Sequence, residues 1–225
     1  MSKKAVIFLG PPGAGKGSVS VLCQEKFNWK HLSTGNVCRE HISNKTDLGQ
    51  EIASIIAQGK LVPDQIIMQM IEMWIVTHQY SLDGIIFDGT PRTVEQSAFI
   101  DKMLNVQFKE FETLVIKFEV SEDVLIHRIE SRVVCGNKDC QRVYSLQTGN
   151  PLQSKQLMKC DVCDHNLVHR PDDSVETLKK RLAVYYQHEK DMVQYYKDKG
   201  ITILVVDAQE PIEVVFENIK QISNY

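Results

Sequence analysis

Short apolar runs alternate with longer segments of helical periodicity along most of the chain. The apolar runs predict strands at Ala5–Leu9, Trp29–Leu32, Gly84–Asp88, Thr113–Glu119 and Ile201–Val206. The periodic segments predict helices at Ser18–Phe27, Thr34–Gln58, Asp64–His78, Thr93–Asn105, Glu122–Val133, Asp172–Lys199 and Pro211–Ile222. This alternation favours an α/β fold, in which a five-stranded parallel sheet carries helices on both faces.

Two segments interrupt the alternation. Residues 33–63 predict short helices with Gly49 and Gly59 as the breaks between them. Residues 134–169 are rich in Asn, Gln, Lys and Gly and have few large apolar side chains, so they cannot build a core alone. With 225 residues and 43% hydrophobic content, we expect one core domain from residues 1–32, 64–133 and 170–225, carrying both segments as insertions.

The formal net charge of −3 gives the chain no global positive field, which argues against nucleic-acid or membrane partners. Affinity for phosphates must therefore come from basic groups that converge locally. The first apolar run is too short for a signal sequence and is broken at Gly10, and no run is long enough to span a membrane. We expect a cytoplasmic monomer.

A glycine-rich loop follows the first predicted strand, with the sequence Gly10-Pro11-Pro12-Gly13-Ala14-Gly15-Lys16-Gly17-Ser18. Glycines allow backbone N–H groups to approach phosphate oxygens, and Lys16 adds an ammonium for the outer phosphates. The strict pattern has Ser or Thr directly after the lysine, whereas here Gly17 precedes Ser18. A structural turn with a solvated lysine is the alternative, but the strand before the loop and the helix after it favour phosphate binding.

Four of the six cysteines form two pairs, Cys135-x4-Cys140 and Cys160-x2-Cys163, separated by nineteen residues. This spacing is typical of a zinc ribbon, and four thiolates would fill the tetrahedral shell of a structural metal. His165 or His169 replacing a cysteine is the alternative. Cys23 and Cys38 lie outside the pattern and are expected to be small buried hydrophobes.

Arginine-bearing motifs recur downstream of the loop. They are Leu32-Ser33-Thr34-Gly35 with Arg39, Gly59-Lys60-Leu61-Val62, Asp88-Gly89-Thr90-Pro91-Arg92-Thr93, Arg128 with Arg132, Arg170-Pro171-Asp172-Asp173, and Arg181. In this order and at this spacing, the chain resembles the adenylate kinases with a long, zinc-binding lid, from about Ala5 to the last helix. The resemblance implies a P-loop core, a nucleoside-monophosphate-binding insertion at 33–63 and a zinc-binding lid at 134–169.

The resemblance also implies phosphoryl transfer from MgATP to AMP, giving two ADP, with Mg²⁺ accompanying ATP and structural Zn²⁺ in the lid. It assigns ATP binding to Gly13, Ala14, Gly15, Lys16, Gly17, Ser18, Arg128 and Arg132. It assigns AMP binding to Thr34, Arg39, Lys60, Leu61, Val62, Gly89, Arg92 and Gln96, where the donor and acceptor of the Gln96 amide would suit an adenine edge. The implied catalytic residues are Lys16, Asp88, Arg92, Arg128, Arg132, Arg170 and Arg181.

The same residues fit this chemistry on physical grounds. Guanidinium groups hold phosphates by planar bidentate contacts, and Arg128 and Arg132 are four residues apart on one predicted helix, so both can face one cleft. A phosphate acceptor is already anionic near neutral pH, so no general base is required. Asp88 would hold water on magnesium, or alternatively cap the next helix. The two insertions would close over the nucleotides and exclude water.

Two positions depart from the family pattern, which usually has Asp where Asn36 stands and Phe where Thr90 stands. We expect reduced turnover or altered metal dependence. Three other functions remain open: a kinase for another nucleoside monophosphate, a nucleic-acid-binding zinc ribbon fused to an ATPase-like core, and a former kinase kept as a binding protein. The net charge and the absence of a basic stripe interleaved with aromatic residues argue against nucleic acid.

Overall fold

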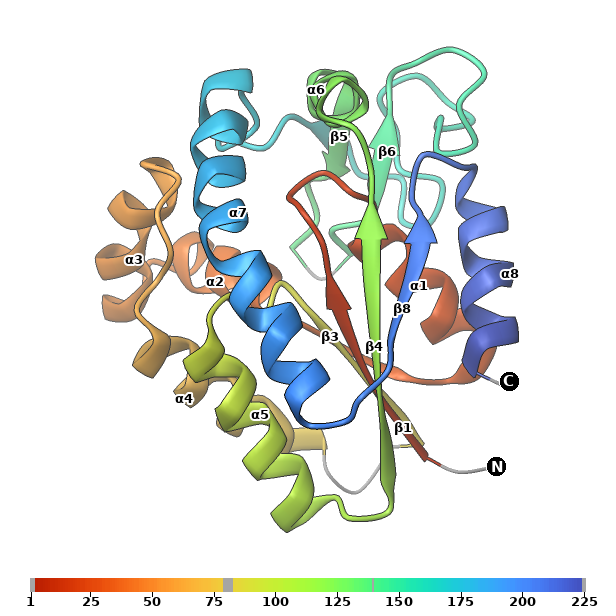
Figure 1. Ribbon diagram of the computed structural model, residues 1–225. Coiled ribbons are helices and arrows are strands. Elements are labelled where there is room, and N and C mark those ends of the chain that lie inside the picture. Colours follow the sequence, from red (N-terminus) through yellow and green to blue (C-terminus); the bar gives the residue numbers. More distant parts are fainter. Residues whose placement is uncertain (1–2, 79–82, 139, 224–225) are drawn as a thin grey trace.

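The computed structural model describes residues 3–78, 83–138 and 140–223, and five parallel strands form its main sheet (Figure 1). The strands are β1 (Lys3–Leu9), β2 (Lys30–Ser33), β3 (Gly84–Asp88), β4 (Phe111–Glu119) and β8 (Ile203–Asp207). Their order is β2-β3-β1-β4-β8. This confirms the predicted fold class. Residues 1–2, 79–82, 139 and 224–225, which belong to the predicted domain ranges, lie outside the described residues.

Helices cover both faces of this sheet (Figure 1). They are α1 (Lys16–Phe27), α4 (Asp64–His78), α5 (Val94–Gln107), α6 (Glu122–Ser131), α7 (Val175–Asp198) and α8 (Ile212–Ser223). Because successive strand side chains point to opposite faces, Val6 and Phe8 of β1 pack in one core with α1, α6 and α8. Ile7 and Leu9 pack in the other core with α4, α5 and part of α7. In the described residues, no helix has both the length and the apolar character needed to cross a membrane.

The segment predicted as helical from 34 to 58 consists of two helices, α2 (Thr34–Ser43) and α3 (Asp47–Ala57). The expected break at Gly49 is wrong, because the chain turns at residues 44–46 and Gly49 lies inside α3. Thr46 caps α3 by accepting a hydrogen bond from the Gly49 N–H at 3.0 Å. A Cβ at Gly49 would lie 2.1 Å from the carbonyl oxygen of His41. The glycine therefore serves the close approach of α2 and α3.

The cysteine-bearing segment forms a second, three-stranded sheet. It contains β5 (Arg132–Cys135), β6 (Val143–Ser145) and β7 (Leu167–Val168), and β5 pairs antiparallel with both neighbours. The prediction that the preceding helix continues to Val133 is wrong, because α6 ends at Ser131. β-branched Val133 and Val134 favour the strand. Arg132 therefore starts β5 instead of sharing a helix with Arg128.

The strand order indicates at which end of the sheet a ligand is expected to bind. From β1 the chain runs first to β2 and β3 on one side and then crosses to β4 and β8 on the other. Ligands of such sheets bind outside the carboxyl ends of the strands where this order reverses. The glycine-rich loop leaves β1 at this point, and Phe8 near the end of β1 pairs with Asp88 at the end of β3.

Gly49→Ala should destabilise the protein, because the added methyl would clash with backbone that cannot rotate away. We expect a loss of about 1–2 kcal/mol in the free energy of unfolding, since overpacking costs about 1–3 kcal/mol and the helix propensity of alanine returns part of it. Urea denaturation measures the change. Ser54→Ala, at an exposed position of the same helix, is the control and should be neutral or stabilising. Equal stability of both variants would contradict the packing argument.

Candidate functional site

A cleft of about 740 Å³ opens at the carboxyl ends of the main-sheet strands. The loop after β1, the insertion, the cysteine-bearing segment and α7 all contribute to its walls. Every residue predicted to bind nucleotide or to act in catalysis lines it: Gly13, Ala14, Gly15, Lys16, Gly17, Ser18, Thr34, Arg39, Lys60, Leu61, Val62, Asp88, Gly89, Arg92, Gln96, Arg128, Arg132, Arg170 and Arg181. Residues from widely separated parts of the chain therefore share one cavity.

The glycine-rich loop presents the bare N-terminus of α1 to this cleft. Gly15 occupies the N-cap position with φ 91°, no side chain accepts a hydrogen bond from the first turn, and that turn holds no acidic residue. By contrast, Ser33 caps α2 and Thr46 caps α3 through their side chains. The first N–H groups of α1 and the positive end of its dipole are therefore available to an anion.

Lys16 lies folded onto its own loop. Its Nζ donates to the carbonyl oxygens of Gly10 at 2.6 Å and Pro11 at 2.8 Å. Burial lowers the pKa of Lys16 to about 8, against the opposing effect of the Asp88 charge. Any additional anion that reaches this ammonium would therefore stabilise its charged form.

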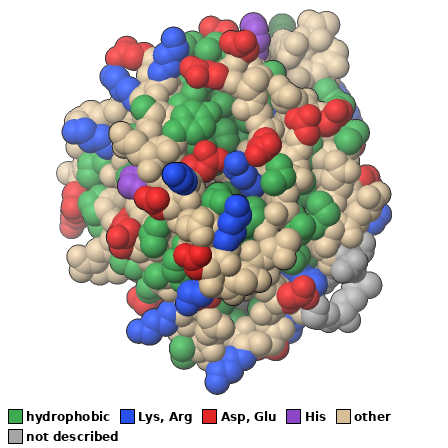
Figure 2. Space-filling view, in the orientation of Figure 1, with side chains coloured by type: hydrophobic (Ala, Val, Ile, Leu, Met, Phe, Trp, Pro, Cys, Tyr) green, Lys and Arg blue, Asp and Glu red, His purple; other side chains and the backbone are tan. Residues whose placement is uncertain are grey.

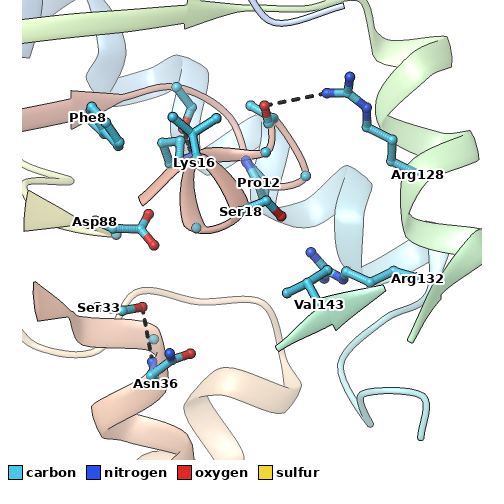
Figure 3. A pocket seen from close by; sticks show the side chains of 18 of the residues that line it. Phe8, Pro12, Lys16, Ser18, Ser33, Asn36, Asp88, Arg128, Arg132 and Val143 are labelled. Carbon is cyan, nitrogen blue, oxygen red and sulfur yellow. Dashed lines mark hydrogen bonds between the residues drawn. The ribbon is translucent and has the colours of Figure 1, made fainter. Parts of the chain in front are cut away.

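Asp88 faces the loop from the end of β3 (Figure 3). Burial opposes its ionisation, but the hydrogen bond with His31 at 3.1 Å and the nearby charges of Lys16 and Arg92 outweigh it and lower the pKa of Asp88 to about 2. The carboxylate is therefore ionised at neutral pH. The alternative that Asp88 caps the next helix is wrong, because Thr93 caps α5.

The departure at Gly17 has a geometric cause. A Cβ at position 17 would lie 3.3 Å from Oδ2 of Asp88, closer than most carbon contacts of this kind. Ser or Thr directly after Lys16 would therefore press against the carboxylate. Ser18, one residue later, also lines the cleft and supplies the hydroxyl there.

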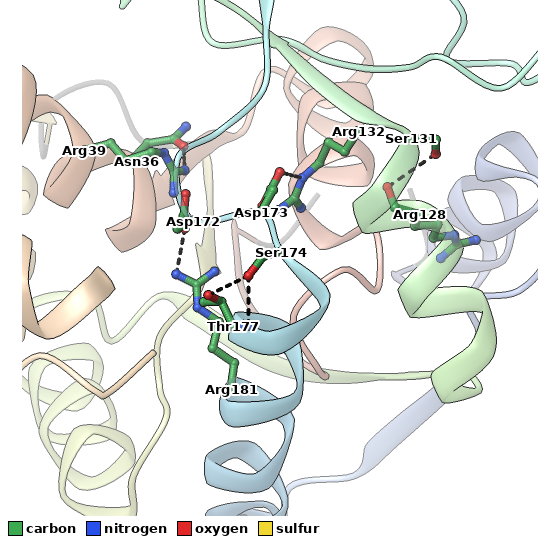
Figure 4. A network of polar contacts seen from close by, with 10 residues as sticks. All are labelled: Asn36, Arg39, Arg128, Ser131, Arg132, Asp172, Asp173, Ser174, Thr177 and Arg181. Carbon is green, nitrogen blue, oxygen red and sulfur yellow. Dashed lines mark hydrogen bonds and ion pairs between the residues drawn. The ribbon is translucent and has the colours of Figure 1, made fainter. Parts of the chain in front are cut away.

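The arginines form a network with two neighbouring carboxylates (Figure 4). Arg181 Nη2 donates to Asp172 Oδ2 at 2.6 Å, and Arg132 Nε donates to Asp173 Oδ2 at 2.7 Å. The pKa of Arg170 is lowered by burial and by the positive charges of Arg39 and Arg132, although the guanidinium stays protonated at physiological pH. The cluster thus carries more positive charge than its own carboxylates neutralise.

Arg128 lies apart from this network (Figure 4). Its Nη2 donates to the carbonyl oxygen of Ala208 at 2.7 Å, and its Nη1 reaches that of Ala14 at 3.4 Å. Arg128 therefore bridges the glycine-rich loop and the turn after β8, at the other end of the cleft. Figure 3 shows Arg128 and Arg132 projecting separately toward the loop.

The opposite wall holds Gln96, whose amide is already engaged. Its Oε1 accepts from the Thr90 hydroxyl at 3.0 Å and the Arg92 N–H at 2.8 Å, and its Nε2 donates to Asp64 Oδ1 at 2.7 Å. The oxygen of this amide therefore already has two partners, and its predicted contact with an adenine edge stays a prediction. Thr34, Lys60, Leu61 and Val62 line the same wall.

Four polar partners of these side chains are not among the residues predicted from the sequence to form the site. They are His31, Asp64, Asp172 and Asp173. Asp172 and Asp173 belong to the Arg170-Pro171-Asp172-Asp173 motif, and two carboxylates so close to an arginine were a usable signal. Asp64 is an acidic residue in the first turn of a helix, a placement that the helix dipole alone would explain. The sequence around it therefore gave no sign of its contact with Gln96.

The four cysteines of the ribbon pattern converge beside the second sheet, where Cys135 ends β5 and the other three lie in turns and loops. Their Sγ atoms all lie within 4.8 Å of one another, with Cys135 and Cys163 at 3.3 Å and Cys140 and Cys160 at 3.7 Å. A tetrahedral zinc site with Zn–S bonds of about 2.3 Å separates its sulfurs by about 3.8 Å, so the donor set fits zinc. Among the described residues, neither histidine belongs to the cluster.

The remaining two cysteines are buried, as expected. Cys23 has no exposed surface and Cys38 is 4% exposed. Burial raises the pKa of the Cys23 thiol to about 12, so it stays protonated. Both are packed in the hydrophobic cores beside the main sheet.

On the face shown in Figure 2, Lys and Arg side chains are interspersed with Asp and Glu, without a continuous basic stripe.

Sequence comparison with known proteins points to one family. The model of the family described as adenylate kinase matches residues 8–201. Adenylate kinase from Clostridium botulinum (strain 657 / Type Ba4) is 39% identical over 217 residues, covering 96% of this chain and 97% of that protein. Adenylate kinases from Clostridium tetani and Thermosipho melanesiensis are both 36% identical, over 96% of this chain and 97% and 98% of those proteins.

Proposed function

The chain belongs to the adenylate kinase family, and we propose that it transfers a phosphoryl group reversibly from MgATP to AMP, giving two ADP. The observation that carries this proposal is the cleft itself. It joins an uncapped helix N-terminus to arginines from the insertion, β5 and α7. One nucleotide does not need so many separate cations, whereas a donor and an acceptor held together do.

The donor nucleotide would lie along the glycine-rich loop. The N–H groups at the start of α1 would bind its phosphates, and Lys16 would exchange the Gly10 and Pro11 carbonyl oxygens for phosphate oxygens. Arg128, between Ala14 and Ala208, would contact the donor nucleotide on the side of its base. The turn after β8 would supply backbone around that base.

The acceptor phosphate would lie between Arg39 and Arg92. The Nε atom of Arg39 is buried and, among the described residues, has no hydrogen-bond partner. A buried donor without a partner is costly, so an incoming phosphate oxygen would satisfy it. Asn36 accepts from Arg39 but adds no negative charge, which leaves the Arg39 charge for the ligand.

Catalysis would rest on positioning and charge stabilisation, with Arg132, Arg170 and Arg181 around the moving phosphoryl group. Neither of the two cleft carboxylates nearest the arginines, Asp88 and Asp172, is suited to act as a general base. The pKa of Asp88 is about 2, and although burial opposes ionisation of Asp172, the charge of Arg181 lowers its pKa. The acceptor needs none, because its phosphate is mostly dianionic at neutral pH.

Ionised Asp88 and the hydroxyl of Ser18 are oxygen ligands of the kind that hold hydrated Mg²⁺, and both line the cleft beside Lys16. Mg²⁺ bound with ATP would neutralise part of the phosphate charge. The four cysteines would hold structural Zn²⁺, which would keep the second sheet in shape. All four ligand positions would be protein sulfurs, leaving none for substrate.

We also propose that residues 33–63 and 134–169 act as the acceptor-binding insertion and the lid. Contacts across the cleft support this division. Arg142 pairs with Glu25 of α1, and Lys138 Nζ donates to Asn44 Oδ1 at 3.4 Å. Closure would exclude water from the phosphoryl group. The monomeric state, the cytoplasmic location and the effect of Asn36 on magnesium dependence stay predictions.

The first test is ADP formation from ATP with AMP, UMP, CMP or GMP in a coupled assay. We expect kcat/KM for AMP to exceed the others at least tenfold, since a polar base site rejects the wrong hydrogen-bonding edge strongly. Lys16→Met should reduce kcat/KM for AMP by more than about 100-fold, because phosphate charge stabilisation is lost. A preference for another monophosphate would assign the chain to a different acceptor, and salt-dependent RNA binding without ADP formation would replace the proposal.

The pH profile of kcat/KM for ATP should fall above about pH 8. Lys16 binds phosphate in its charged form, and its lowered pKa of about 8 means that this form declines as pH rises through 8 in the free enzyme. At saturating ATP the phosphates raise the pKa of Lys16, so the kcat profile should break at higher pH. Initial rates from pH 6 to 10 check both. Identical breaks in the two profiles would contradict the assignment to Lys16.

Cys160→Ser should lose the bound metal and lower the melting temperature by about 5 °C or more, because metal binding energy is folding energy in a segment with little core. Elemental analysis should find one zinc per wild-type chain and far less in the variant. Cys23→Ala, which removes a buried thiol outside the cluster, is the control and should keep the metal. Full metal occupancy in Cys160→Ser would contradict the site.

A further inference from the structure

The amide of Gln96 can be oriented in only one way. Asp64 is the partner of Nε2, and an ionised carboxylate accepts hydrogen bonds but cannot donate them. The other end of the amide faces two donors, the Thr90 hydroxyl and the Arg92 N–H. Rotating the amide by half a turn would set donor against donor and acceptor against acceptor, so this arrangement is fixed.

The fixed orientation leaves one polar group of the amide for a ligand. An amide oxygen has two lone pairs, and both are used by Thr90 and Arg92. The nitrogen has two hydrogens, of which Asp64 takes one. Gln96 lines the cleft, so the second N–H is what it can offer there.

Thr90 sets this state without reaching the ligand. It has no exposed surface and does not belong to the cleft wall described above. The Thr90 hydroxyl can donate only one hydrogen bond, and it goes to Gln96. The phenylalanine that family members usually carry at this position has no donor and would leave one lone pair of Gln96 free.

We propose that Thr90 is a specificity-determining positioning residue. By occupying one lone pair of the Gln96 oxygen, it leaves this side chain able only to donate a hydrogen bond to the acceptor base, instead of both donating and accepting. This rests on the proposed function. A donor-only Gln96 recognises a ring-nitrogen acceptor such as N1 of adenine, but it does not recognise the exocyclic amino group. It rejects hypoxanthine and guanine, whose N1 carries a hydrogen.

The experiment measures kcat/KM for AMP and for two analogues that differ at these two atoms. Purine riboside 5′-monophosphate keeps the N1 acceptor and lacks the amino group, whereas IMP carries a hydrogen on N1. In the wild type, where Gln96 accepts no hydrogen bond from the amino group, we expect purine riboside monophosphate to lie within about twofold of AMP, below the roughly two- to tenfold that one neutral hydrogen bond contributes. IMP should be poorer than AMP by more than about tenfold, because it leaves two buried donors facing each other.

Thr90→Val removes the hydroxyl at constant shape, and Thr90→Ser keeps the hydroxyl as the matched control. In Thr90→Val the freed oxygen of Gln96 can accept from the amino group, so the ratio of AMP to purine riboside monophosphate should rise about fivefold, mainly through KM. The wild type and Thr90→Ser should share the lower ratio. A merely structural role would change kcat/KM for all three substrates by the same factor and leave this ratio unaltered.

An unchanged ratio in Thr90→Val, or a wild-type ratio well above about twofold, would overturn the inference. Thr90→Ala supplies a second variant without the hydroxyl if the valine variant does not fold, and the wild-type ratio decides the question even without either. Failure of the proposed function has a different signature. In that case AMP itself would give no ADP, whatever residue stands at position 90.

Discussion

Seven arginines and Lys16 line the central cleft of a chain whose formal net charge is −3. Two like charges about 4 Å apart repel by about 4 kcal/mol at an effective dielectric constant of 20, so such a cluster is unfavourable without anions. The chain supplies a few of its own, with Asp172 and Asp173 paired to Arg181 and Arg132. The remaining charge is the driving force for binding phosphates. The rest of the fold can be understood as the means of holding these cations in place.

The parallel sheet performs the first part of this task. Its strand order brings the ends of β1 and β3 together, which places Asp88 beside the loop that carries Lys16. The tight fit explains why position 17 has no side chain. Asp88 partly offsets the effect of burial on Lys16, and Lys16 helps to keep Asp88 ionised. Each charge in this pair therefore helps to maintain the other inside a poorly hydrated site.

The sequence predicted the fold class, and every residue that it assigned to a nucleotide site lines this cleft, because strand periodicity and motif order depend on short stretches of chain. What it missed depends on contacts between distant segments. The turn at residues 44–46 was placed at Gly49 because a glycine usually marks a break, whereas this glycine serves helix packing. Arg132 was assigned to a helix because its spacing from Arg128 suited one, yet pairing with β6 and β7 draws the following residues into a strand.

The cleft wall that holds Gln96 shows the same limit of sequence-based prediction more clearly. Glutamine at position 96 predicts an amide near a base, but the availability of its oxygen depends on Thr90 and Arg92, and its orientation depends on Asp64 from another helix. Thr93 also donates to Asp64 at 2.9 Å, so the cap of α5 and the base-reading amide share one carboxylate. A substitution at Thr90 or Asp64 would change the hydrogen-bonding capacity of Gln96 from outside the cleft lining, whereas Arg92 contributes its backbone N–H whatever its side chain. The hydrogen bonds that Gln96 can offer are therefore set by a network of neighbouring groups, and the motif residue alone does not determine them.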